Sequence, residues 1–188
     1  MAQVVTIGLD IAKSVFQVHG VAADGEVVIR RQLRRAQVIG FFAKLPACLV
    51  GIEACASAHF WGRELRRLGH EVLRMPPSYV KPYVKRQKND AADAEAICEA
   101  VTRPSMRFVE VKSPEQQSVI VLHKVRTMLM RQRTQLSNAV RGHMADFGLV
   151  GPIGREGLAG LLKIMEASDE RLPEEAKMCW SCSAGSCG

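Results

Sequence analysis

The first part of the chain is dominated by apolar runs with the spacing of β-strands. Such runs cover residues 4–10, 14–21 and 26–33, and the sequence Ala23-Asp24-Gly25 is a turn signal between the second and the third. Because strands joined by short turns pair antiparallel, this part of the chain predicts a three-stranded antiparallel meander.

From residue 36 onward, helical and strand patterns alternate. Residues 36–45 have helical spacing, and the apolar run 49–53 follows them. Residues 58–68 again have one apolar face and are closed by Gly69, after which residues 70–75 indicate another short strand. The order of three strands, a helix, a strand, a helix and a strand is that of an RNase H-like α/β fold, a mixed sheet flanked by helices.

Two further helices are predicted beyond the sheet. Residues 89–101 form the first, with Asn89 as its cap and small or apolar side chains turned inward. Ser113 followed by Pro114 is a typical helix start, and apolar side chains then recur at alternating steps of three and four as far as about Phe147. This spacing predicts a long helix or one strand of a coiled coil.

These patterns divide the chain into four segments. Residues 1–112 are expected to form the RNase H-like domain and residues 113–148 the long helix. The glycine-rich stretch 149–165 is a linker or the start of a further domain. Residues 166–188 are first acidic and then rich in cysteine, without a core pattern, so we expect a disordered or loosely attached tail.

Composition and charge narrow the class of protein. With 47% hydrophobic residues, the 188-residue chain can form an ordinary core, which excludes a disordered chain. Its 26 Lys and Arg residues against 19 Asp and Glu residues give a net charge of +7, which favours a polyanionic partner such as nucleic acid. No run approaches the roughly 20 apolar residues that span a bilayer, and the amino terminus has no signal-peptide pattern. A cytoplasmic protein is therefore expected.

Four carboxylates stand at informative positions. Asp10 and Glu53 each end an apolar run that predicts a strand, and Asp90 and Asp93 lie three residues apart at the start of a predicted helix. Gathered at one edge of the sheet, these acids would repel one another and raise each other's pKa, and one or two Mg²⁺ ions (or Mn²⁺) would relieve the repulsion. Taken singly, each acid is more simply a helix cap or a turn residue. The combination of strand ends and helical spacing is what favours a divalent-metal site.

A basic stretch precedes the Asp90 motif. Between Trp61 and Lys88 the basic residues far outnumber the acidic ones, which are Glu64 and Glu71. Contact with a nucleic acid backbone is one interpretation, and a solvated surface is the other. Tyr79 and Tyr83 either stack on unpaired bases or pack on the domain. The residues predicted to bind nucleic acid are Arg63, Arg66, Arg67, Lys81, Lys85, Arg86 and Lys88.

Three motifs carry a resemblance to a known family. They are Gly8-Leu9-Asp10-Ile11-Ala12-Lys13, Gly51-Ile52-Glu53-Ala54-Cys55 and Lys88-Asn89-Asp90-Ala91-Ala92-Asp93-Ala94. In this order they resemble the motifs of the DEDD transposases encoded by bacterial insertion sequences. The segment from Pro76 to Tyr83 and the long helix also look like that family, so the resemblance covers about Val4 to Leu162.

The resemblance implies a RuvC-like, RNase H-fold domain whose catalytic, metal-binding tetrad is Asp10, Glu53, Asp90 and Asp93. It further implies Mg²⁺ or Mn²⁺ as cofactor, DNA strand cleavage and transfer in transposition as activity, and a structured guide RNA as a second nucleic-acid partner. A homo-oligomer held by the long helix is also expected. The family continues into a second domain with a nucleophilic serine, and no serine of this sequence matches it, so a truncated transposase is expected.

Two other interpretations stay open at this point. A non-catalytic remnant would bind RNA or DNA and dimerise through the long helix without using the acids. An ATPase or sugar-kinase relative is also conceivable, because Gly8-Leu9-Asp10-Ile11 resembles the first phosphate motif of the actin-like fold. That interpretation lacks a second glycine-rich loop and leaves Asp90 and Asp93 unexplained.

Overall fold

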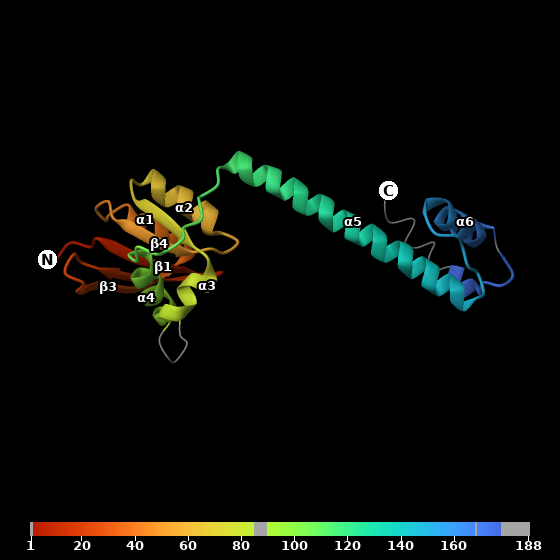
Figure 1. Cartoon of the computed structure of the whole chain (residues 1–188), viewed down its shortest axis with the longest axis horizontal. Helices are drawn as coiled ribbons and strands as arrows, with labels where there is room; N and C mark the ends of the chain where they lie inside the picture. Colours follow the sequence, from red (N-terminus) through yellow and green to blue (C-terminus); the bar gives the residue numbers. More distant parts are fainter. Residues whose placement is uncertain (1, 85–89, 168, 178–188) are drawn as a thin grey trace. The chain divides into compact units, whose positions relative to one another are not determined.

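The structure is a computed structural model that describes residues 2–84, 90–167 and 169–177. The chain divides into two compact units, Met1–Gln117 and Ser118–Gly188 (Figure 1). The first unit holds the predicted RNase H-like domain and the first residues of the long helix. No helix in the described ranges combines the length and the apolar character that a membrane crossing requires.

The first unit contains the predicted sheet. Its five strands have the order β3-β2-β1-β4-β5, in which β1 pairs antiparallel with β2 and parallel with β4. The pair β2·β3 is antiparallel and the pair β4·β5 is parallel, so the sheet is mixed and RNase H-like, as predicted. The strands are β1 (Thr6–Ile11), β2 (Val15–Val21), β3 (Val27–Arg34), β4 (Leu49–Glu53) and β5 (Glu71–Met75).

Helices cover both faces of this sheet. In Figure 1, α1 and α2 lie on one face and α4 lies on the other. The helix predicted over 36–45 is short, because the 3₁₀-helix η1 occupies its first residues. A helical segment between β5 and α4 was not predicted and consists of α3 and η2. The helices are η1 (Arg35–Gln37), α1 (Val38–Phe42), α2 (Ala58–Arg67), α3 (Pro77–Val80), η2 (Lys81–Tyr83) and α4 (Asp90–Val101).

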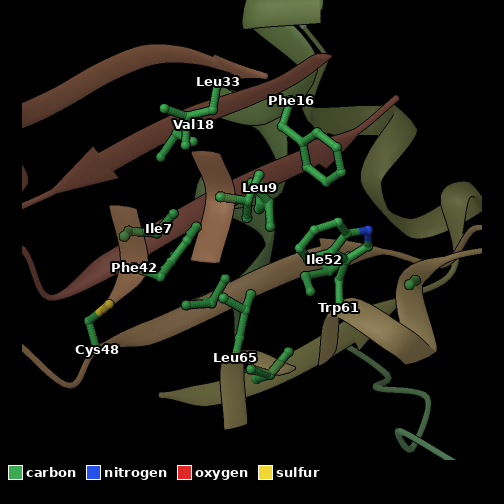
Figure 2. Packing of buried hydrophobic residues seen from close by; sticks show 14 of the residues in the cluster. Ile7, Leu9, Phe16, Val18, Leu33, Phe42, Cys48, Ile52, Trp61 and Leu65 are labelled. Atoms are coloured by element: carbon green, nitrogen blue, oxygen red, sulfur yellow. The ribbon is translucent and has the colours of Figure 1, made fainter. Parts of the chain in front are cut away.

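The main hydrophobic core lies between the sheet and the helices α1 and α2. Leu9 of β1 and Ile52 of β4 point into it, where Trp61 of α2 packs (Figure 2). The ring of Phe16 meets the ring of Trp61 edge to face at 5.0 Å between centroids. Because strand side chains alternate, the neighbours of Leu9 and Ile52 in sequence must face the α4 side.

On the α4 side, two glycines allow the helix to approach the strands closely. A Cβ on Gly8 would lie 2.0 Å from the carbonyl oxygen of Ala94, and one on Gly51 would lie 2.8 Å from Cβ of Val101. Neither distance is possible without a shift of the helix. The absence of side chains at these two positions therefore fixes how closely α4 packs on β1 and β4.

We expect Gly8→Ala to lower the free energy of unfolding by about 1–3 kcal/mol or more, because α4 must move away to admit a methyl group. Urea denaturation followed by fluorescence is the measurement. The matched control is Gly40→Ala in α1, where an added Cβ would have nothing within 4 Å and the negative φ is compatible with alanine. Equal stability of the two variants would show that α4 does not pack in this way.

The second unit is built on the long helix α5 (Pro114–Asp146), which confirms the helix predicted over 113–148. The segment expected to be a linker or the start of a domain contains α6 (Arg155–Glu166), and Leu161 of α6 packs with Met144 and Leu149. Leu172, from the expected tail, is buried in the same cluster. Residues 149–167 and 169–177 therefore contain a helix and buried apolar side chains that their glycine content and charge do not predict. Residues 168 and 178–188 lie outside the described part.

An arginine organises the loop between α5 and α6. The guanidinium of Arg141 donates to the carbonyl oxygens of Pro152 at 2.7 Å and of Gly154 at 2.6 Å. Gly154 has a φ of 102°, a conformation that glycine adopts without strain. The glycines of this stretch thus serve a defined loop rather than a flexible linker.

Candidate active site

The two strand acids lie side by side at one end of the sheet. Leu9 of β1 is level with Ile52 of β4 in a parallel pair, so Asp10 and Glu53 follow at the next level of the same two strands. Neighbouring strands are about 4.8 Å apart. Both acids face α4, because each stands two residues after the glycine against which that helix packs. Both are partly exposed.

Helix α4 begins at the same end of the sheet. The Sγ atom of Cys98 lies 3.7 Å from the carbonyl oxygen of Thr6, and Gly8 lies against Ala94 and Cys98. A step along β1 toward Asp10 is therefore a step along α4 toward its first turn. That turn starts at Asp90 and contains Asp93, so the backbone brings all four positions to one edge.

A cleft of about 590 Å³ lies at this edge. Glu53 and Asp93 both line it, and α3 and η2 form another part of its wall. Among the described residues, its remaining polar side chains are Ser78 and Lys81. The described lining therefore combines carboxylate oxygens, a hydroxyl group and a lysine ammonium group.

The donor set fits a hard divalent cation in its chemistry. Carboxylate oxygens are the ligands that Mg²⁺ and Mn²⁺ prefer, and neither a thiol nor an imidazole lines the cleft in the described part of the chain. Within those same residues, no group of three or more His, Cys, Asp or Glu side chains is close enough together to hold a metal ion. Asp10, Glu53 and Asp93 are among these residues, so their side chains do not form a metal-binding group in this structure, and Asp10 does not line the cleft. The side chain of Asp90 lies outside the described residues.

The predicted nucleic-acid residues separate into two places. Lys81 lines the cleft with Glu53 and Asp93. Arg63, Arg66 and Arg67 lie on α2, which covers the opposite face of the sheet (Figure 1). Lys85, Arg86 and Lys88 lie outside the described residues.

The three arginines of α2 also have partners within the protein. Arg63 donates to the carbonyl oxygen of Lys112 at 2.8 Å and to Oε1 of Gln117 at 2.7 Å. Arg66 donates to the carbonyl oxygen of Val72 at 2.9 Å, and Arg67 pairs with Glu64. These contacts give each of them a structural role, so their contact with nucleic acid stays a prediction.

The tyrosines of the same stretch differ from each other. Tyr83 is partly buried against the cluster of Met75 and Val80, and the guanidinium of Arg103 lies 5.8 Å from its ring centroid. Tyr79 is exposed. Packing on the domain thus accounts for Tyr83, and base stacking is left as an interpretation for Tyr79 alone.

Sequence reasoning missed a buried arginine that anchors the segment leading to α5. Arg74 of β5 is 5% exposed, and burial lowers its pKa. Its Nη1 atom lies 2.7 Å from Nδ1 of His59 and donates to the carbonyl oxygen of Glu110 at 2.9 Å. The backbone N–H of Lys112 also donates to Nδ1 of His59, and Nη1 of Arg74 lies 2.9 Å from Nε2 of the same ring. The cluster pins residues 109–112 to the sheet.

We expect Arg74→Ala to reduce the free energy of unfolding by about 2–4 kcal/mol, because it leaves His59 and a backbone carbonyl without their buried donor. Faster tryptic cleavage after Arg107 and Lys112 should accompany the loss. Arg107→Ala, at an exposed arginine, is the control for the stability measurement and should change it by less than about 0.5 kcal/mol. A stable Arg74→Ala variant would contradict an anchoring role.

The two buried thiols add no nucleophile to the site. Cys48 and Cys98 are buried, and burial raises the pKa of each to about 11. Nδ1 of His70 lies 3.4 Å from Sγ of Cys48, but it also accepts from the backbone N–H of Cys48, and Nε2 lies 3.1 Å from the carbonyl oxygen of Phe42. This histidine is part of the core, where it satisfies backbone groups.

Comparisons with known proteins agree with the motifs. The model of the DEDD transposase family of IS110 elements, described as "Transposase", matches residues 7–148. A "Probable family 20 transposase" of Pseudomonas aeruginosa is 59% identical over 160 residues, which are 85% of this chain and 47% of that protein. The "Transposase for insertion sequence element IS1328" of Yersinia enterocolitica is 42% identical over 154 residues, 82% of this chain and 46% of that protein.

The chain spans about half the length of the curated relatives it matches. Among solved structures, T. thermophilus RuvC in complex with a Holliday junction substrate is similar with a TM-score of 0.38 and 13% identity, over 57% of this chain and 99% of that one. Gly8, the glycine of the motif that resembles the first phosphate motif of the actin-like fold, is explained by the approach of α4. The match over residues 7–148 and the identity to these relatives show that the chain belongs to the DEDD transposase family of IS110-type insertion sequences.

Proposed function

We propose that this chain forms the metal-dependent catalytic domain of a DNA transposase, with Asp10, Glu53, Asp90 and Asp93 as the residues that hold Mg²⁺ or Mn²⁺. One observation carries the proposal. Asp10 and Glu53 are level on adjacent parallel strands and face the helix whose first turn carries the other two acids. The relatives of this chain are named as transposases, which supports DNA as the substrate.

The residues of the site have distinct tasks in this proposal. Divalent cations bound by carboxylates activate an attacking oxygen and stabilise the leaving oxygen in phosphodiester chemistry. The chain itself holds two of the acids on strands, where the hydrogen-bonded ladder limits their movement, and the others on the first turn of α4. Lys81 lines the same cleft, which supports its proposed role of binding a phosphate group beside the acids.

Two further partners belong to the proposal. A structured guide RNA is a second nucleic-acid partner, by the resemblance to the family and the net charge of +7. A second copy of the chain is the partner of α5, because this helix exposes large apolar side chains along much of its length. With DNA as the substrate, the proposed compartment is the bacterial cytoplasm.

Calorimetric titration of Mn²⁺ into the whole chain, beside an Asp10→Ala/Asp93→Ala variant, tests the metal site. We expect uptake by the parent chain and its loss in the variant, because two of the four ligands are gone. Asp24→Ala/Glu26→Ala, at the exposed turn between β2 and β3, removes the same charge and should leave the uptake unchanged. Equal and negligible uptake by all three proteins would leave the non-catalytic remnant that binds nucleic acid as the better account.

A further inference from the structure

The edge strand β3 and the residues after it form the most basic segment of the sheet. Residues 27–37 contain four arginines and no acidic residue. The strand order begins with β3, so it has a neighbour on one side only. Basic side chains on an edge strand commonly serve only to prevent edge-to-edge association. Their distribution over the two faces of the sheet suggests a second role.

The four arginines divide between the two faces. The guanidinium of Arg31 lies 5.8 Å from the ring centroid of Phe41, and that of Arg35 lies 5.1 Å from the ring centroid of Trp61. The guanidinium groups of Arg31 and Arg35 therefore lie on the face of the sheet that carries the main core. Arg30 and Arg34 alternate with Arg31 along the strand and are directed to the α4 side, where both are exposed.

The α4 side of β3 is continuous with the acidic edge. Gln32 pairs with Gln17 of β2, and Gln17 pairs with Asp10 of β1. One row of polar side chains thus crosses the sheet from Gln32 through Gln17 and Asp10 to Glu53, flanked on β3 by Arg30 and Arg34. From Gln32 to Asp10 the row covers two strand spacings, or about 10 Å.

A groove of about 400 Å³ follows this row. Residues of β2 and β3 line its sheet side, and residues of the first turns of α4 line the other. The sheet residues are Gln17, Val18, His19, Arg30, Arg31 and Gln32. Arg34 does not line the groove and follows Gln32 by two residues on the same face of β3. Most of those α4 residues are alanines (Ala91, Ala92 and Ala94), whose small side chains leave room for a bound strand. Glu95 is an acidic side chain on the helix side of the groove. The groove lies toward β2 and β3, whereas the cleft of Glu53 and Asp93 lies toward β4 and α3.

We propose that this groove holds the sugar-phosphate backbone of a nucleic acid strand that continues to the acidic edge. Arg30 binds a phosphate in the groove, Arg34 binds one just beyond it on the same face of β3, and the amides of Gln17 and Gln32 donate to phosphate or sugar oxygens. The proposal rests on the proposed function only for the cleavage of the strand at the acidic edge. Binding of the strand in the groove does not depend on it. It moves the main nucleic-acid contact from the arginines of α2 to the opposite face of the sheet.

The test is the salt dependence of binding, measured by fluorescence anisotropy with labelled single-stranded DNA, duplex DNA and RNA of one sequence and without added metal. Each lost phosphate contact lowers the slope of log K against log salt by about 0.7 for a single strand and 0.9 for a duplex. Arg30→Gln/Arg34→Gln should therefore bind about 25- to 60-fold more weakly at about 0.1 M salt, and the difference should vanish near about 1 M.

Two variants serve as controls. Arg30→Lys/Arg34→Lys keeps both charges and should keep most of the slope. Arg103→Gln/Arg107→Gln removes the same charge after the end of α4, at the far edge of the sheet, and should bind like the parent chain. A loss confined to DNA or to RNA would support the groove and assign it to that strand.

An unchanged slope in Arg30→Gln/Arg34→Gln would overturn the inference, as would self-association of this variant with unaltered affinity, because that is the signature of edge protection alone. A loss in Arg66→Gln/Arg67→Gln instead would place the contact on α2. If nucleic acid binding depends on Arg30 and Arg34 but the Mn²⁺ titration shows no uptake, the proposed metal site fails while the groove stands.

Discussion

Mg²⁺ is expected to stabilise the parent chain against urea, whereas Asp10→Asn/Glu53→Gln should lose this stabilisation and become more stable than the parent in EDTA. Ligand binding to the native state adds about 1.4 kcal/mol at a concentration ten times Kd and about 2.7 kcal/mol at one hundred times Kd. Without metal, two carboxylates about one strand spacing apart repel each other, and neutralising them should relieve on the order of 1–2 kcal/mol. The parent chain should therefore be the more stable protein in Mg²⁺, and the Asp10→Asn/Glu53→Gln variant the more stable one in EDTA.

Unfolding in urea is best followed by the fluorescence of Trp61, which lies in the core of the first unit. The chain has two tryptophans, so a Trp180→Phe background makes the fluorescence report on that unit alone. Asp24→Asn/Glu26→Gln is the control, because it removes the same charge from an exposed turn and keeps an acceptor for the backbone N–H of residue 26. A parent chain that Mg²⁺ does not stabilise, or an Asp10→Asn/Glu53→Gln variant that responds like the parent, would contradict a metal site at this edge.

Much of the sheet is predictable because its signals are local. The apolar runs of β1 and β4 and the partial alternation along β2 reflect burial of the strands themselves, and the pattern gives their order along the chain. The pair α3 and η2 escapes prediction, and the predicted helix over 36–45 is overestimated in length, for the opposite reason. A helix of one turn contains too few residues for a period, and its stability comes from tertiary packing.

The placement of the acids has a sequence signal that is easily overlooked. Both strands end in the pattern glycine, apolar residue, acid, as Gly8-Leu9-Asp10 and Gly51-Ile52-Glu53. The glycine and the acid share a face, so a helix that packs on the two glycines must pass beside the two acids. By contrast, the local count of charges could not show that the arginines of α2 lie on the other face of the sheet. The face that a helix covers is decided by tertiary packing, which a local count of charges does not contain.

The long helix leads to the prediction with the largest effect. Leu122, Leu129 and Leu136 are 70%, 55% and 56% exposed, and with Val125 they form one stripe on α5. We expect the parent chain to form a homodimer through this stripe and Leu122→Lys/Leu129→Lys to be monomeric. Burying a leucine contributes at least about 1.5 kcal/mol, and a dimer of the variant loses four of them, so dissociation should be favoured by about 10⁴-fold or more.

The matched control uses two threonines of the same helix. Thr127 and Thr134 are also seven residues apart and exposed, and they lie on the face of α5 opposite the leucines, since each residue advances the helix by about 100°. Thr127→Lys/Thr134→Lys adds the same charge and should sediment as the parent does. Analytical ultracentrifugation under reducing conditions is the measurement, because Cys55 is exposed and its disulfides would mimic a dimer. A monomeric parent chain would mean that something other than a second copy covers this stripe, and a dimeric leucine variant would place the contact elsewhere on the chain.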